Sequence, residues 1–116
     1  MSKKIFIVYG HHNTKKSFNA SIRDTFIDEA KKKGHQIDLI NLHEEKPIPF
    51  FDGSGPNDQI LDYRKRLEAS DVLFMISPCY NLRATAILEN WIDLTLAPKW
   101  FFSFKRLVGN WGYPVA

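Results

Sequence analysis

Residues 5–19 read IFIVYGHHNTKKSFN, in which an uninterrupted apolar run ends at Gly10 and a polar loop follows. An apolar strand without polar alternation is typical of a parallel sheet, because both faces of such a sheet are covered. From Phe18 to Ala30, apolar residues recur at spacings of three and four residues, and Gly34 follows as a stop signal. The chain is therefore predicted to begin with a strand, a polar loop and an amphipathic helix.

The same alternation continues along the chain. Further strands and helices are predicted at 37–42, 58–70, 72–76 and 85–96. The prolines and glycines of 44–57 indicate a long loop instead. Strands that alternate with helices predict an α/β fold with a parallel sheet, a strand order of 2-1-3 and helices on both faces. A chain of 116 residues suits one domain, which we expect to span 1–116.

Composition and charge limit the classes of function. The chain is 44% hydrophobic and 25% charged, and no apolar run approaches the roughly 20 residues of a membrane-spanning helix. The N-terminus lacks a signal-peptide pattern and the single cysteine, Cys79, cannot form an internal disulfide, so we expect a cytoplasmic protein. The formal charge of +3 is spread over separate segments, which favours an anionic small ligand over nucleic acid.

The C-terminal segment 99–113 is rich in aromatic residues and shows no clear helical or strand periodicity. Its aromatic residues are Trp100, Phe101, Phe102, Phe104, Trp111 and Tyr113. Large exposed apolar patches mark interfaces or ligand grooves. We therefore expect self-association, as a homodimer or a higher homo-oligomer, or the absence of a partner segment.

Two loops are candidates for a binding site. Ligands of an open parallel sheet bind beyond the carboxyl ends of the strands, which places loops 10–19 and 77–84 beside the same crevice. The first loop leads into a helix N-terminus, whose free N–H groups attract phosphate, although Ser17 or Asn13 could equally act only as a helix cap. The second loop reads Ser-Pro-Cys-Tyr-Asn-Leu-Arg, which could support a flat heterocycle or form a plain surface turn.

The stretch from Ile7 to Asn13, with Ser17-Phe18-Asn19-Ala20, resembles the flavodoxin-like NAD(P)H:quinone oxidoreductases. Similar segments at 38–42, 86–93, 97–98 and 102–104 extend the resemblance over nearly the whole chain. This resemblance implies a flavodoxin-like three-layer sandwich. It also implies a C-terminally truncated fold, because members of the family continue with two further strands.

The resemblance further implies which residues hold a flavin. The phosphate is expected on one or both of the adjacent histidines and on the start of the helix: His11, His12, Ser17, Phe18 and Asn19. The ring is expected on the second loop: Pro78, Cys79, Tyr80, Asn81 and Leu82. Asn81, Arg83 and Thr85 depart from the family pattern, and Pro-x-Tyr-Asn instead looks like the related flavin mononucleotide reductases.

The implied activity is hydride transfer from NAD(P)H, through a bound flavin, to a quinone or a similar acceptor. FAD is the expected cofactor and FMN the alternative. We assign no catalytic side chain and expect neither a metal nor a nucleic-acid partner. The alternative is a truncated, self-associating remnant that binds flavin weakly or not at all and has no catalytic activity.

Overall fold

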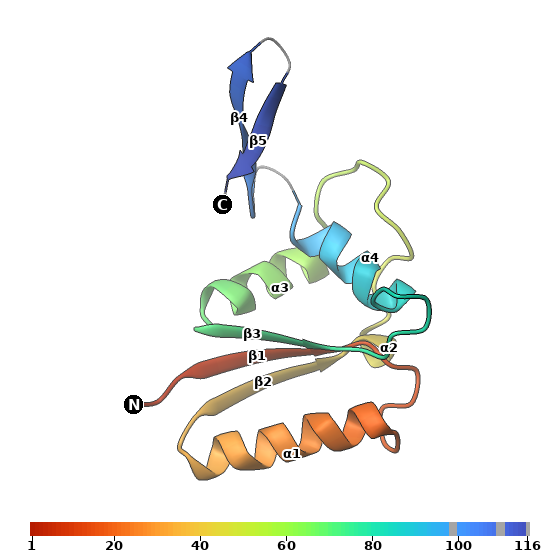
Figure 1. Ribbon diagram of the computed structural model, residues 1–116, viewed down its shortest axis with the longest axis vertical. Coiled ribbons are helices and arrows are strands. Elements are labelled where there is room, and N and C mark those ends of the chain that lie inside the picture. The colour runs from red at the N-terminus through yellow and green to blue at the C-terminus, as the bar shows by residue number, and fades with distance from the viewer. Residues whose placement is uncertain (98–99, 109–110, 116) are drawn as a thin grey trace.

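The computed structural model describes residues 1–97, 100–108 and 111–115, with the backbone alone for 103–108 and 111–115. Within these residues, an α/β unit precedes a β-hairpin (Figure 1). The α/β unit contains β1 (Lys4–Tyr9), α1 (Phe18–Lys32), β2 (Gln36–Asn41), α2 (Leu42–Glu45), α3 (Asp58–Glu68), β3 (Val72–Ile76) and α4 (Ala86–Thr95). The hairpin contains β4 (Ser103–Val108) and β5 (Trp111–Val115).

Strand β1 is the centre of a parallel sheet whose strand order is β2-β1-β3. Ile5 pairs with Ile37 of β2 on one side and with Val72 of β3 on the other. Helix α1 covers one face of this sheet, and α3 and α4 cover the other (Figure 1). The predicted α/β fold, strand order and placement of helices on both faces are therefore confirmed.

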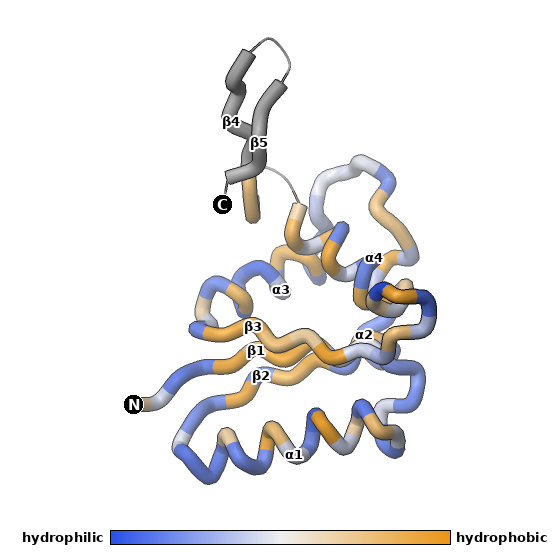
Figure 2. Tube along the Cα trace, viewed as in Figure 1, coloured by the Kyte–Doolittle hydropathy of each residue, from blue (hydrophilic) through white to orange (hydrophobic). Residues whose placement is uncertain are grey.

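The side chains of β1 alternate between two hydrophobic cores. Phe6 and Val8 pack with Trp91 on the side of α3 and α4, whereas Ile7 and Tyr9 pack against α1. All five side chains are fully buried. Figure 2 shows the corresponding hydrophobic colouring along the three strands. Successive side chains of a strand point to opposite faces of the sheet. A strand buried on both faces therefore needs apolar residues at every position, which explains the continuous run that begins at Ile5.

The helix boundaries follow from capping residues. The Ser17 hydroxyl accepts a hydrogen bond from the N–H of Ala20 at 3.0 Å, so α1 begins after Ser17. At its other end, Lys31 and Lys32 complement the helix dipole, and Gly34 adopts a φ of 83°. The Asn57 side chain caps α3 in the same way, by accepting from the N–H of Ile60 at 2.9 Å.

An ion pair between Asp38 and Arg66 joins β2 to α3, the helix that covers this face of the sheet. Arg66 donates to both carboxylate oxygens of Asp38, at 2.6 and 3.0 Å, and its guanidinium lies 5.4 Å from the centre of the Phe6 ring. The hydrogen bonds from Arg66 lower the pKa of Asp38 below its usual value. The pair therefore stabilises the fold while Asp38 is ionised, and this contribution is lost as the pH falls through the lowered pKa.

Two segments contain regular structure that was not predicted. Helix α2 begins at Leu42, the last residue of the predicted strand 37–42, and extends into the predicted loop 44–57, and Lys46 at its end has a φ of 51°. The tail, which shows no clear periodicity in sequence, contains β4 and β5, which form an antiparallel pair. Gly109-Asn110 between two short runs is the sequence signal that predicts such a hairpin.

The side chains at the start of the aromatic tail lie near α3. Trp100 lies 5.0 Å from the guanidinium of Arg64, and its ring stacks on Phe101 at 6.2 Å. The side chains of Phe104, Trp111 and Tyr113 lie outside the described residues. Within the described ranges, no helix is long and apolar enough to cross a membrane.

Gly10 is the point at which α4 approaches the end of β1. A Cβ atom added at Gly10 would lie 2.9 Å from the Cβ of Leu88 and 3.0 Å from the Oγ1 of Thr85. We expect Gly10→Ala to lower the free energy of unfolding by about 1–2 kcal/mol, because α4 must shift outward. Urea denaturation measures this loss. The control is Gly55→Ala, since nothing lies within 4 Å of a Cβ there; equal effects of the two substitutions would contradict the close approach.

Candidate functional site

The two loops predicted at 10–19 and 77–84 converge at the carboxyl edge of the sheet. In the structure the first loop spans residues 10–17, up to α1, and the second loop spans residues 77–85, up to α4. The N–H of Gly10 donates to the carbonyl of Ile76 at 2.8 Å, which joins the ends of β1 and β3. The Thr85 hydroxyl donates to the carbonyl of Gly10 at 2.7 Å. The structure therefore brings together the two loops that the sequence predicted to flank one crevice.

Hydrogen bonds from Tyr9 hold the first loop in place. The Tyr9 hydroxyl donates to the carbonyl of Asn13 at 2.9 Å and lies 2.8 Å from the hydroxyl of Ser17. The single proton of the Tyr9 hydroxyl points to the carbonyl of Asn13. The Ser17 hydroxyl therefore donates to the Tyr9 oxygen, and it also accepts from the N–H of Ala20. The Ser17 hydroxyl is thus fully engaged as a helix cap and as a link to the core.

Asn13 has a different local role. Its side-chain oxygen accepts from the N–H groups of Lys15 and Lys16, at 3.1 and 2.8 Å. Asn13 therefore closes the turn before α1 and does not cap the helix, whereas Ser17 does. Of the two residues that the sequence left open as caps, the structure selects Ser17.

The N-terminus of α1 keeps two donors without partners. In the described part of the chain, the backbone N–H groups of Phe18 and Asn19 bind no acceptor. The first turn of α1 contains no acidic side chain, and Lys15 and Lys16 lie immediately before it. Free N–H groups, the positive end of the helix dipole and nearby lysines together favour an anion at this position.

The two histidines of the first loop stack on each other. Their ring centres are 4.3 Å apart, and the Nδ1 of His11 accepts from the N–H of Asn13 at 2.9 Å. Partial burial and the neighbouring His12 lower the pKa of His11. Neutral His11 therefore carries its proton on Nε2 and can act as a hydrogen-bond donor. His12 is exposed.

The second loop presents its side chains to solvent. Tyr80 and Leu82 are exposed, Leu82 to 98%, and Leu82 adopts a φ of 59°. Cys79 and Asn81 are largely accessible too, and no hydrogen bond of the described residues involves the side chains of 79–82. A leucine in the left-handed region is strained, and such strain is concentrated at ligand-binding positions.

The sequence analysis did not identify three residues that hold the two loops in position. Tyr9 was assigned only to the first strand, yet its hydroxyl reaches the first loop. Thr85 was noted only as a departure from a family pattern, yet its hydroxyl binds the first loop. Arg23 was also missed: its guanidinium is buried, 4.5 Å from the centre of the Tyr9 ring, and donates to Asn41 at 3.0 Å. A tyrosine at the end of a buried strand is the one signal that pointed to this network.

The site offers no cluster of metal ligands. Among the described residues, no group of three or more histidine, cysteine, aspartate or glutamate side chains converges. What the arrangement provides is a charged helix start beside a loop with exposed apolar side chains. It can hold a molecule that has an anionic end and a flat, largely apolar body.

A fold of this topology, with two such loops at the carboxyl edge, defines the class to which the protein belongs. The family model described as the flavodoxin-like fold matches residues 3–114, and the chain belongs to this family. The family resemblance seen in the sequence is thereby confirmed.

Curated relatives carry quinone oxidoreductase names. The chain is 24% identical over 125 residues to ribosyldihydronicotinamide dehydrogenase [quinone] of Homo sapiens, which covers 86% of this chain and 54% of the relative. It is 29% identical over 100 residues to the FMN-dependent NADH:quinone oxidoreductase of Mycoplasma mobile, which covers 77% of this chain and 48% of the relative. The chain thus spans about half the length of these relatives.

Solved structures agree with this fold. The chain superimposes on an NAD(P)H:quinone oxidoreductase from Methanothermobacter marburgensis with a TM-score of 0.77 and 18% identity, covering 88% of this chain and 56% of the other. An FMN-dependent NADH-azoreductase from Bacillus anthracis, solved with FMN, gives a TM-score of 0.70 and 14% identity, covering 86% and 59%. At these identities the likeness establishes the fold.

Proposed function

We propose that the two loops bind FMN and that the chain acts as a flavin-dependent NAD(P)H:quinone oxidoreductase. The observation that carries this proposal is the convergence of the loops through Thr85 and Gly10. The free N–H groups at the start of α1 and the exposed apolar groups of the second loop support a ligand that has a phosphate and a planar ring.

The phosphate would lie on the free N–H groups of Phe18 and Asn19. Lys15 and Lys16 add positive charge there, and the Nε2 proton of His11, or His12 beside it, can donate a further hydrogen bond. The Ser17 hydroxyl supports this position indirectly, since it fixes the first turn of α1.

The planar ring would lie along the second loop, where Pro78 and Cys79 follow β3. Tyr80 and Leu82 offer exposed apolar surface for stacking, and Asn81 offers both donors and acceptors. When bound, the flavin would supply two-electron transfer between NAD(P)H and a quinone. The chain's own residues hold and orient the group, and we assign no proton transfer to any side chain.

FMN is preferred over FAD in this proposal. Relatives and a solved structure of the same fold are named FMN-dependent, whereas the sequence-based expectation of FAD as the main cofactor finds no support in those names. The partners of the proposed reaction are NAD(P)H and a quinone-like acceptor, and a cytoplasmic location fits a reaction that draws on NAD(P)H.

Titration with three flavins tests the proposed function. We expect the purified chain to bind FMN, measured by quenching of flavin fluorescence, and to bind riboflavin at least about 10-fold more weakly, because riboflavin lacks the phosphate. FAD serves as the comparison for cofactor size. The FMN-loaded protein should reduce a soluble quinone at the expense of NADH or NADPH. Equal binding of FMN and riboflavin would contradict the phosphate position, and absence of any flavin binding would favour the non-catalytic remnant.

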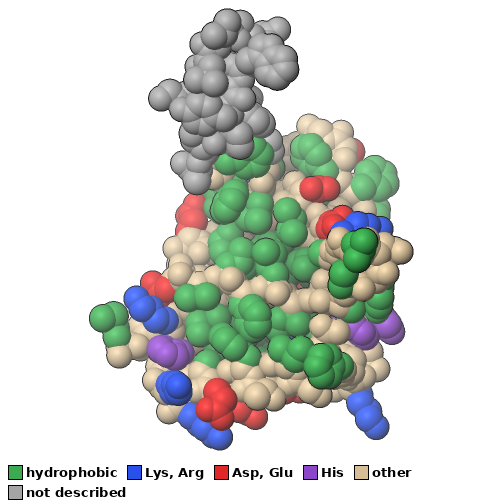
Figure 3. Space-filling view, viewed as in Figure 1, with side chains coloured by type: hydrophobic (Ala, Val, Ile, Leu, Met, Phe, Trp, Pro, Cys, Tyr) green, Lys and Arg blue, Asp and Glu red, His purple; other side chains and the backbone are tan. Residues whose placement is uncertain are grey.

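We also propose that the chain forms a homodimer through the free edge of β3. Among the described strands, β3 pairs only with β1, so one row of its backbone groups has no partner strand. Val72 and Met75 of β3, and Ile22 of α1, are all exposed. On the face shown in Figure 3, hydrophobic side chains gather on both sides of the sheet, toward α1 and toward the opposite helices. Strand β3 carries no charged residue, so two copies can pair without charge repulsion.

Light scattering after size-exclusion chromatography tests the dimer. Met75 is 40% exposed on β3 and Leu61 is 48% exposed on α3, which makes them a matched pair. We expect the unmodified chain and Leu61→Lys to elute as dimers and Met75→Lys to elute as a monomer, because lysine at the edge blocks strand pairing. A monomeric unmodified chain, or a Met75→Lys dimer, would exclude this interface.

A further inference from the structure

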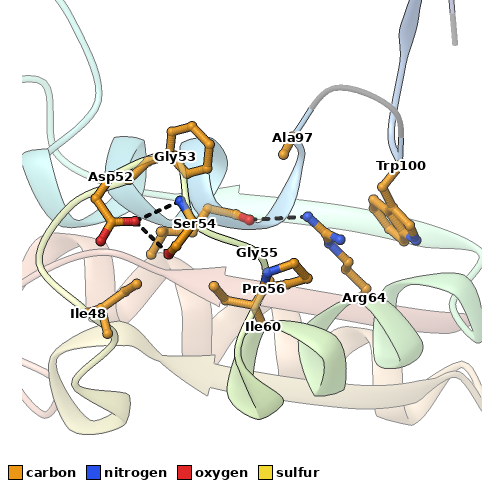
Figure 4. Close-up of a pocket in the computed structure, with 12 residues that line it drawn as sticks. Ile48, Asp52, Gly53, Ser54, Gly55, Pro56, Ile60, Arg64, Ala97 and Trp100 are labelled. Carbon is orange, nitrogen blue, oxygen red and sulfur yellow. Dashed lines mark hydrogen bonds between the residues drawn. The ribbon is translucent and has the colours of Figure 1, made fainter.

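A cavity lies apart from the two loops. It has a volume of about 580 Å³ and is lined by residues of segment 48–56, by helix α3, by the C-terminal end of α4, and by Ala97 and Trp100 (Figure 4). This volume is within the range of small-molecule sites. Most of its lining is apolar: Ile48, Phe51, Pro56, Ile60, Leu94 and Trp100. No residue of 10–17 or 77–85 lines it, so it is separate from the proposed flavin site.

Arg64 places a positive charge on the cavity wall. Its Nε donates to the carbonyl of Thr95 at 3.0 Å and one terminal nitrogen donates to the carbonyl of Leu94 at 3.4 Å. These bonds hold the guanidinium rigidly against the end of α4. Within the described part of the chain, Arg64 has no carboxylate partner and its other terminal nitrogen has no acceptor. Among the described residues, the positive charge of Arg64 is thus met only by backbone carbonyls and by the ring of Trp100.

The carboxylate that lines the cavity does not neutralise Arg64. Asp52 accepts hydrogen bonds from the N–H and the hydroxyl of Ser54, at 2.9 and 2.6 Å. These bonds lower the pKa of Asp52, and the carboxylate forms no ion pair with Arg64. Figure 4 shows Asp52 and Arg64 at opposite sides of the cavity, with Pro56 between them in the view. An anion at Arg64 therefore does not have to displace Asp52.

Flat surfaces flank the guanidinium. The ring of Trp100 lies 5.0 Å from the central carbon of Arg64, and both side chains point toward the same cavity (Figure 4). The ring of Pro56 and the side chain of Ile60 supply further apolar wall. A planar aromatic body can pack against such surfaces, while Arg64 repels a positively charged molecule.

We propose that this cavity binds a small aromatic carboxylate, whose carboxylate pairs with Arg64 and whose ring lies against Trp100 and Pro56. The chemistry is that of an arginine with free N–H donors beside an aromatic wall in a concave, mainly apolar site. The site does not depend on the proposed flavin function, because its residues belong to other elements.

Calorimetric titration with 2-naphthoate tests the site, and 2-naphthamide is the uncharged control of the same shape. We expect 2-naphthoate to bind at least about 10-fold more tightly than the amide, and Arg64→Gln to remove this difference. Equal binding of acid and amide to the unmodified chain, or no binding of either, would overturn the proposal.

A second variant covers the case in which Arg64→Gln does not fold, since Arg64 also holds the end of α4. Ala97→Trp fills the cavity and keeps Arg64, and we expect it to abolish 2-naphthoate binding. Leu61→Lys, on the exposed side of α3, should bind like the unmodified chain. Unchanged 2-naphthoate binding by Ala97→Trp would place the ligand elsewhere. FMN titration of Arg64→Gln and Ala97→Trp separates the two proposals, because neither substitution lies in the two loops of the proposed flavin site.

Discussion

Phe18→Pro is expected to weaken FMN binding by about 10- to 100-fold while α1 stays intact. Phe18 is the first residue of α1 and its N–H has no partner among the described residues. Proline is tolerated at this helix position, and Ser17 before it is already extended, with φ −166° and ψ 168°. The substitution therefore removes one donor to the phosphate, and a hydrogen bond to a charged group contributes about 1.5–3 kcal/mol. Flavin fluorescence titration measures the change.

The matched control is Phe18→Ala, which removes the same exposed ring but keeps the N–H group. We expect it to retain most of the FMN affinity, and circular dichroism should show equal helix content in both variants. Riboflavin binding should respond alike to the two substitutions, since it has no phosphate. If proline and alanine weaken FMN binding equally, the phosphate does not lie on the start of α1.

Trp91→Ala is expected to lower the free energy of unfolding by about 3–5 kcal/mol, a large fraction of the stability of a domain of this size. Trp91 is fully buried and packs edge-on against Phe6 and beside Tyr63, with ring centres 6.1 and 6.3 Å away. Alanine leaves a cavity between α4, α3 and the sheet. Thermal and urea denaturation measure the loss, and a variant that does not fold at all agrees with the prediction.

Trp91→Phe separates packing from polarity at the same position. The Trp91 Nε1 is buried and has no hydrogen-bond partner among the described residues, so the indole N–H is itself unfavourable there. Phenylalanine removes this donor and keeps most of the aromatic contact. We expect Trp91→Phe to cost less than half as much as the alanine substitution. A similar loss in both variants would show that the packing of α4 does not depend on ring volume.

The elements with strong patterns could be predicted from the sequence. The central strand follows from one uninterrupted apolar run, because such a run is typical of a strand whose two faces are both covered. Helix α1 follows from apolar spacing between Ser17, which caps it, and Gly34, which stops it. The hairpin β4–β5 was not predicted, because the many aromatic residues of the tail obscure the alternation of its strands.

The location of the site could be predicted from the sequence, but the hydrogen bonds that join its residues could not. Two loops at the ends of neighbouring parallel strands must meet at one edge of the sheet, which the topology alone requires. The roles of individual side chains depend on distances in space, which the spacing of residues along the sequence does not give. Tyr9 appeared as a core residue, and only coordinates show its hydroxyl reaching Asn13 and Ser17. Thr85 and Gly10 are 75 residues apart in sequence.

That hydrogen bond between Thr85 and Gly10 depends on the alignment of the strands. Strand β3 places Ile76 beside Gly10, and a shift of β3 by one residue would move the loop that follows it away from Gly10. Any molecule that bridges the loops consequently selects the correctly aligned sheet, and it raises the free energy of unfolding in proportion to the logarithm of its concentration. If FMN binds as proposed, it would therefore also stabilise this alignment of the strands.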